Sequence, residues 1–118
     1  MYLDEQILRW IVGLVDASRH LDAVALGASV RASLALERIA RAWALLKDRE
    51  YVTPEDVDVL FLPVLGHRII FTPTFLAEAR RIGRDQALTL FRDLCYERVP
   101  RPEPDAEHEL RVLGGYSG

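Results

Sequence analysis

The chain has 118 residues and a mass of 13.4 kDa, which is the size of one domain. Half of its residues are hydrophobic and 28% are charged, so it should fold as a globular unit and not remain disordered. The formal net charge of −3 argues against a protein that wraps nucleic acid. Lys47 is the one lysine among 15 basic side chains, so the basic surface carries the planar, forked donors of arginine, which suit carboxylates and phosphates.

Cysteine content and hydropathy limit the cellular compartment. The single cysteine, Cys95, excludes an internal disulfide and a zinc site built from cysteines of this chain. Charged residues interrupt every apolar run before it reaches the roughly 18 to 20 residues that span a bilayer. Asp4 and Glu5 precede the first apolar stretch, which is the wrong order for a secretory signal. We therefore expect a cytoplasmic protein without a membrane span.

Two helices are predicted in the first half of the chain. Residues 3–19 have apolar side chains at steps of three and four, which indicates an amphipathic helix. Residues 20–28 form a connection that contains Gly27. Ser29 fits an N-cap, whose side-chain oxygen accepts a hydrogen bond from the first amides of a helix over about 30–47. The expected apolar face of this second helix is Ala32, Leu36, Ile39, Trp43 and Leu46.

Two Thr-Pro pairs, at 53–54 and 72–73, each predict the start of a helix. The threonine hydroxyl can cap the helix, and proline at the first helical position loses no needed hydrogen bond. The first of these helices should run to about Gly66, with Pro63 bending or interrupting it. The second, about 73–82, should end at Gly83.

The remaining segments complete an all-α pattern. Residues 67–71 contain β-forming side chains but are too few for a sheet, so we treat them as a linker. The last helix, about 85–97, should be capped by Asp85. It should bury Leu88, Phe91, Leu94 and Cys95. Prolines follow, and residues 101–118 are expected to form a flexible polar tail. The prediction is a small bundle of about five helices over residues 1–100.

No set of residues makes a complete catalytic or metal site. Lys47 lacks the glycines of a phosphate-binding loop. His20, His67 and His108 have no histidine partner at helical spacing, so structural roles are favoured for them over metal binding or base catalysis. No Gly-x-Ser-x-Gly motif surrounds any serine, and Cys95 lies on the apolar face of the last predicted helix, where an inert buried thiol is expected. We predict no catalytic residue and no metal ligand in this chain alone.

Arg31 is out of place for helix stability. It falls in the first turn of a predicted helix, where the dipole prefers an acidic residue and the free N–H groups already attract anions. This position suggests that Arg31 faces something negative. The alternative is an arginine that is solvated or paired with Asp22 or Glu50.

Four segments in register carry a family resemblance. They are Leu-Gly-Ala-Ser-Val-Arg-Ala-Ser-Leu at 26–34, Ala-Arg-Ala-Trp-Ala at 40–44, Tyr-Val-Thr-Pro-Glu-Asp-Val at 51–57 and Val-Leu-Gly-His-Arg-Ile at 64–69. In this order and spacing, over about residues 3–100, the chain resembles the C-terminal lid domain of MoxR-type AAA+ ATPases. Val30 stands where the family usually has proline, which weakens the preset helix start but leaves the arginine position intact.

The resemblance implies a role for Arg31. In these ATPases the lid is a helical bundle packed on an α/β nucleotide-binding core, and the arginine of the Gly-Ala-Ser-x-Arg motif is the sensor-2 residue, which approaches the nucleotide phosphates. By the resemblance that residue is Arg31, and ATP with magnesium is bound mainly by a core that this chain lacks. Whether sensor 2 acts on its own or on a neighbouring subunit's nucleotide stays open. The chain alone should not hydrolyse ATP.

The resemblance also implies partners. These are the core domain of the same protein, the neighbouring subunits of a ring, commonly a hexamer, and von Willebrand factor A-domain proteins, in chaperone-like remodelling of enzyme complexes. We accordingly expect an excised piece of an ATPase or an isolated lid. For His67 and Arg68 we favour a structural role after the third helix over contact with the core or another subunit. Trp10 and Trp43 should be core residues.

Two other functions are alternatives. One is a free-standing helical protein–protein interaction module. The other is a small DNA-binding domain of helix-turn-helix type, with Arg38, Arg41 and Arg49 as phosphate contacts. The acidic balance and the lack of a polar recognition helix argue against DNA binding.

Overall fold

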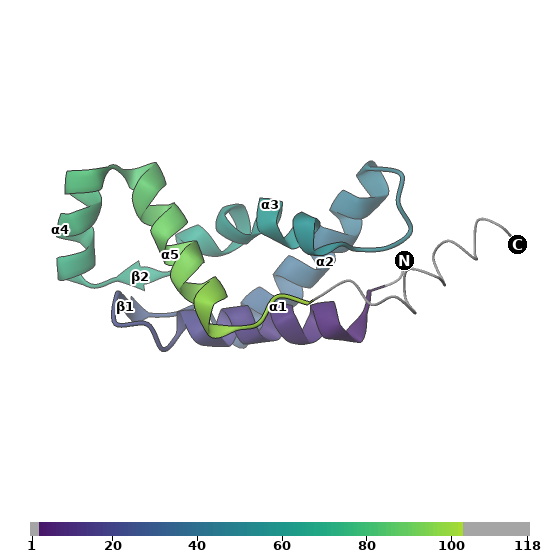
Figure 1. Ribbon diagram of the computed structural model, residues 1–118, viewed down its shortest axis with the longest axis horizontal. Helices are drawn as coiled ribbons and strands as arrows, with labels where there is room; N and C mark the ends of the chain where they lie inside the picture. Colours follow the sequence, from purple (N-terminus) through teal and green to yellow (C-terminus); the bar gives the residue numbers. More distant parts are fainter. Residues whose placement is uncertain (1–2, 103–118) are drawn as a thin grey trace, which may run out of the picture.

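The computed structural model describes residues 3–102, and this part of the chain contains five α-helices and two short strands (Figure 1). They are α1 (Glu5–Ser18), β1 (Val24–Leu26), α2 (Val30–Leu46), α3 (Pro54–Leu65), β2 (Ile70–Phe71), α4 (Pro73–Ile82) and α5 (Arg84–Arg98), with one 3-10 turn, η1, at Gly66–Arg68. The predicted all-α class and small helical bundle are confirmed. The predicted flexible tail, 101–118, lies outside the described residues from position 103 onward.

One hydrophobic core joins the helices. Helix α2 packs against α1 and α3, and α5 packs against α1, α3 and α4. The largest fully buried side chains include Trp10, Phe61, Phe91, Ile11, Leu14, Leu36 and Leu65. The predicted core position of Trp10 is confirmed, whereas Trp43 is half-buried and carries the Lys47 ammonium 4.9 Å from its ring centroid.

The predicted apolar face of α2 is only partly correct. Ile39 and Leu46 are 41% and 78% exposed, while Ala40 and Ala44 are fully buried. The buried side of the helix is Ala32, Ser33, Leu36, Ala40 and Ala44. The small side chains allow α1 and α3 to approach the α2 backbone closely. The helix therefore packs its alanine side against α1 and α3 and leaves the larger Ile39 and Leu46 exposed.

The helix starts at the Thr-Pro pairs follow the prediction. Thr53 accepts a hydrogen bond from the Asp56 amide, and Thr72 accepts one from the Phe75 amide at 3.2 Å. Helix α4 ends at Gly83, whose φ of +97° favours glycine.

Two details of the later helices differ from prediction. Pro63 does not interrupt α3, which continues to Leu65. The predicted Asp85 cap is wrong, because α5 begins one residue earlier, directly after Gly83, and Asp85 lies inside its first turn. An acidic residue there still favours the helix dipole.

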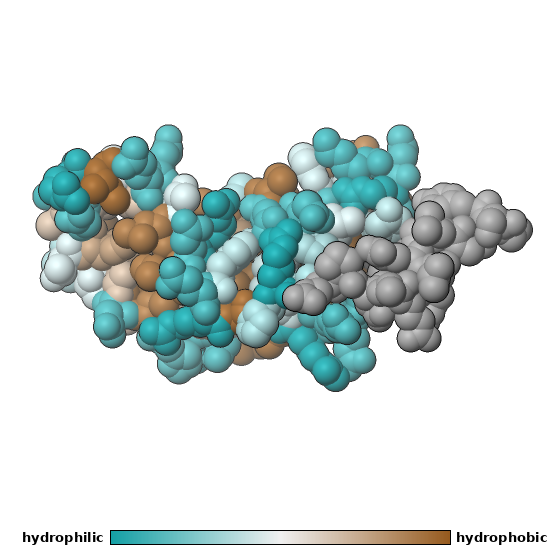
Figure 2. All heavy atoms as spheres, in the orientation of Figure 1, coloured by the Kyte–Doolittle hydropathy of each residue, from teal (hydrophilic) through white to brown (hydrophobic). Residues whose placement is uncertain are grey.

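The two segments predicted as connections pair with each other. Strands β1 and β2 are antiparallel, with Val24 opposite Phe71 and Leu26 opposite Ile70, and the Thr72 amide donates to the Ala23 carbonyl at 2.9 Å. Local periodicity cannot reveal this pairing, because the two segments are far apart in the sequence. The ribbon shows the paired strands at the end of the molecule where α4 begins (Figure 1). Figure 2 shows hydrophobic surface between α4 and α5, bordered by hydrophilic side chains.

Candidate functional site

Arg31 lies exposed in the first turn of α2, as predicted. This turn contains no acidic residue. Ser29 occupies the N-cap position, but its side chain makes no capping hydrogen bond, so that part of the prediction is wrong. The amide of Ala32, which a serine cap would bind, donates to the carbonyl oxygen of Ser29 at 2.9 Å instead. The positive end of α2 therefore has neither a side-chain cap nor a nearby carboxylate on its own first turn.

A surface hollow of about 700 Å³ surrounds this helix start. Its lining residues are Arg19, Ala25, Leu26, Gly27, Ala28, Ser29, Val30 and Arg31. The lining contains two arginines and no carboxylate. Neither guanidinium makes a hydrogen bond or an ion pair with another residue of the described part, 3–102, so the alternative pairing of Arg31 with Asp22 or Glu50 is not observed there. The charged residues that line the hollow are therefore all positive.

Gly27 brings the end of α1 against the start of α2. A Cβ atom at this position would lie 2.6 Å from both the Cα and the Cγ of Arg19. That distance is too short for any side chain, and one of the two atoms belongs to the backbone, which cannot swing aside. Ala28, the next residue, is 1% exposed and anchors the loop in the core. The Gly-Ala-Ser segment thus fixes the point from which Arg31 projects.

Apolar side chains that line the hollow are left uncovered. Leu26 and Val30 are 62% and 68% exposed, although both are large and hydrophobic. Exposed apolar residues beside a charged hollow are typical of a surface that another protein segment covers.

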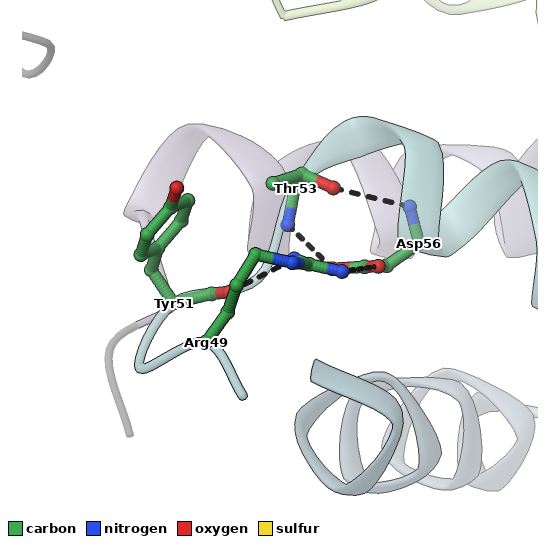
Figure 3. Close-up of polar contacts among 4 residues, drawn as sticks. All are labelled: Arg49, Tyr51, Thr53 and Asp56. Carbon is green, nitrogen blue, oxygen red and sulfur yellow. Dashed lines mark hydrogen bonds and ion pairs between the residues drawn. The ribbon is translucent and has the colours of Figure 1, made fainter. Parts of the chain in front are cut away.

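A second polar cluster lies at the start of α3 and is structural (Figure 3). The Arg49 guanidinium donates to both carboxylate oxygens of Asp56, at 2.7 and 2.5 Å, and to the Tyr51 carbonyl at 3.2 Å. The Thr53 amide donates to Asp56 at 2.8 Å, completing a capping box. Burial acts to raise the pKa of Asp56, but the hydrogen bonds from Arg49 and Thr53 outweigh it, so the pKa lies below its ordinary value.

A third cluster joins the segment after α5 to α3. The Asp58 carboxylate accepts hydrogen bonds from the Tyr96 hydroxyl at 2.7 Å and from the Arg101 guanidinium at 2.8 Å. Arg101 also lies over the Trp10 ring, 5.3 Å from its centroid. Burial and the Asp58 carboxylate raise the pKa of Tyr96. Sequence reasoning missed this cluster, because its members come from three distant segments.

The other residues considered in the sequence analysis have local, structural environments. Arg68 donates to the Val64 carbonyl at 3.1 Å, closing the end of α3 in agreement with the structural role expected for it. His20 lies 3.5 Å from Asp16 on the surface, and His67 is exposed. His108 lies outside the described residues. Burial raises the pKa of the Cys95 thiol to about 12, which keeps it unreactive.

The described part of the chain has no candidate metal site and no candidate membrane span. No three histidine, cysteine or acidic side chains among residues 3–102 gather where they could hold a metal ion. No helix there has both the length and the hydrophobicity needed to cross a membrane.

The basic residues considered for DNA binding are mostly neutralised. Arg41 pairs with Glu37 at 3.1 Å, and Arg49 is engaged by Asp56. Of the three arginines in that alternative, Arg38 alone carries no partner among residues 3–102. A single exposed arginine does not form the phosphate-binding row of a helix-turn-helix domain.

Comparison with known proteins places the chain in a family. Residues 16–89 match the model of the AAA lid domain. The chain is 47% identical over 86 residues to "Chaperone MoxR1" of Mycobacterium tuberculosis, with 65% of this chain and 23% of that protein covered. It is 40% identical over 87 residues to "Protein MoxR" of Paracoccus denitrificans, covering 74% of this chain and 23% of that protein.

A solved structure supports the same relationship. The crystal structure of a candidate ATPase from Cytophaga hutchinsonii matches with a TM-score of 0.68 and 30% identity, covering 86% of this chain and 32% of that chain. The chain spans less than a quarter of the length of the curated relatives cited above.

Proposed function

Because this chain belongs to the AAA lid domain family and is the lid of a MoxR-type AAA+ protein, we propose that Arg31 is its sensor-2 arginine. In the full-length protein this side chain would contact the phosphates of bound ATP. One observation carries the proposal. The Arg31 guanidinium is exposed and unpaired within residues 3–102, in a hollow with a second arginine and no carboxylate.

The hollow suits an anionic group. The start of α2 carries partial positive charge that neither a side-chain cap nor a first-turn acid offsets. Arginine adds a forked donor that matches phosphate oxygens. Bound ATP with its magnesium ion would supply the phosphate chain, held mainly by a core domain outside this chain. A guanidinium aimed at the terminal phosphate would stabilise negative charge there and couple the position of the lid to the nucleotide state.

The proposed partners follow from the same role. The lid would pack on an α/β core domain of its own protein and contact neighbouring subunits of a ring, which we propose to be hexameric. The exposed Leu26 and Val30 beside Arg31 support a covering partner at this point. We further propose chaperone-like remodelling of enzyme complexes in the cytoplasm, with von Willebrand factor A-domain proteins as partners, and no catalysis by the lid alone.

Substitution of Arg31 in the full-length protein tests the assignment. Arg31→Ala should lower the ATP turnover of the assembled protein at least about tenfold, because one charge-assisted contact to a phosphate is lost. Arg38→Ala is the matched control, since Arg38 is an exposed arginine on the same helix outside the hollow. It should leave turnover within about twofold of the wild type. Unchanged turnover of Arg31→Ala in a correctly assembled protein would refute the sensor assignment.

A further inference from the structure

We infer that Arg19 is a second phosphate-binding residue of the site that contains Arg31, an inference that rests on the function proposed above. The two arginines line the same hollow, although one lies at the end of α1 and the other in the first turn of α2. The strand β1 and its flanking turns separate them in the sequence, which is why sequence reasoning overlooked Arg19.

The fold holds the stem of Arg19 at a defined place. Its backbone amide donates to the Asp16 carbonyl at 3.0 Å, which continues the helical path to the last turn of α1. Gly27 then packs directly on the residue, so closely that its missing Cβ would lie 2.6 Å from the Arg19 Cα and Cγ atoms. Since Gly27 lies two residues before the N-cap of α2, this contact fixes Arg19 relative to the helix start that carries Arg31.

The local carboxylates do not neutralise Arg19. Asp16, one turn earlier on α1, lies 3.5 Å from His20, and Glu5 pairs with Arg9 at 2.7 Å. No hydrogen bond or ion pair joins the Arg19 guanidinium to another side chain within residues 3–102. The hollow is lined by two arginines and by no carboxylate, and a bound anion would balance their positive charge. The triphosphate chain of ATP, with several negative charges, fits two forked donors and a helix N-terminus.

Arg19 also contributes to the fold, and the experiment has to separate that contribution from phosphate binding. Arg19 is the C-cap of α1, where a positive charge interacts favourably with the negative end of the helix dipole. Such a contribution affects the stability of the lid and not its affinity for nucleotide. Lysine would preserve the dipole interaction but would lose the forked geometry.

The test measures binding as well as stability in the full-length protein. Dissociation constants for a non-hydrolysable ATP analogue, adenylyl imidodiphosphate, are determined by calorimetry for Arg19→Ala, Arg31→Ala and the double variant. Arg19→Lys separates the fork from the charge, and Arg9→Ala is the matched control on the exposed face of α1. Urea unfolding of each variant reports any loss of stability.

We expect Arg19→Ala to weaken binding of the analogue about tenfold and Arg19→Lys to restore it only partly. Both arginines would contact one phosphate chain, so their effects on affinity should not be independent. The fold-loss of affinity in the double variant should be at least about threefold smaller than the product of the two single-variant losses. Unchanged binding in Arg19→Ala, or losses that multiply fully, would overturn this inference while leaving the role of Arg31 intact. Unchanged binding in Arg31→Ala would instead overturn the proposed function.

Discussion

The starts of α2 and α3 share a local sequence signal but differ in how their polar groups are satisfied. Each helix follows a hydroxyl residue, Ser29 before α2 and Thr53 before α3. At α3 the Thr53 hydroxyl and the Asp56 carboxylate exchange hydrogen bonds with each other's amides, and Arg49 neutralises the carboxylate. At α2 the serine side chain makes no capping bond and an arginine replaces the acid.

The difference separates a structural helix start from one that is available for binding. The groups at α3 are engaged with one another, so they stabilise the fold and offer little to a ligand. The start of α2 keeps its positive end and the Arg31 charge exposed, which costs the isolated lid stability but suits an anion. Stability and function are thus assigned to different helix ends, and substitutions can separate them.

The largest effect on stability is expected from removing the carboxylate at the start of α3. Asp56→Ala deletes the acceptor of three hydrogen bonds and leaves Arg49 without its partner. The free energy of unfolding should fall by about 3 kcal/mol, measured by urea denaturation of this chain. Glu55→Ala, an exposed change in the same turn, is the control and should cost less than about 1 kcal/mol. An equally small loss for Asp56→Ala would contradict the statement that the polar groups at the start of α3 stabilise the fold.

A smaller loss is expected where the loop before α2 touches α1. Gly27→Ala introduces a Cβ that must displace either the loop or the Arg19 backbone, which should destabilise the chain by about 2 kcal/mol. ATP turnover of the full-length protein should fall as well, because the start of α2 moves with the loop. Gly66→Ala is a matched control, since its new Cβ would meet only Leu88 at 3.9 Å. Equal behaviour of the two variants would show that the close contact is not needed.

The smallest expected change in the free energy of unfolding is an increase. Arg31→Glu places an acid in the first turn of α2 and should raise the free energy of unfolding of this chain by about 0.5 kcal/mol. The same change should lower ATP turnover of the full-length protein, so stability and activity move in opposite directions. Arg38→Glu, in the middle of α2, provides the control without a helix-end effect. A destabilised Arg31→Glu variant would mean that Arg31 has a structural role after all.

The sequence correctly predicted the elements that are determined by interactions within a few residues. Thr53 and Thr72 mark their helices because hydroxyl caps followed by proline act within a few residues, and Gly83 ends α4 through its own backbone angle. Trp10 was predicted in the core because its neighbours repeat at helical spacing. The resemblance, and not any local pattern, supplied the role proposed for Arg31.

Features that depend on distant segments were missed. The β1–β2 pairing joins two stretches that each look like a connection. The buried side of α2 is formed by alanines such as Ala40 and Ala44, which contribute little to a hydrophobic pattern but allow close helix packing. Arg49 was considered as a phosphate contact, whereas the fold pairs it with Asp56. Gly27 was the one residue in the sequence that could have pointed to Arg19. Its contact with Arg19, which requires a glycine, exists only in the folded chain.

The most direct test of the central claim is nucleotide discrimination by the full-length protein with Arg31→Ala. If the start of α2 binds the terminal phosphate, the dissociation constant for ATP should rise about tenfold while that for ADP changes by less than about twofold. The free energy of unfolding should stay within about 0.5 kcal/mol of the wild type. Equal weakening of ATP and ADP, or no change in either, would contradict the assignment of this helix start to the terminal phosphate.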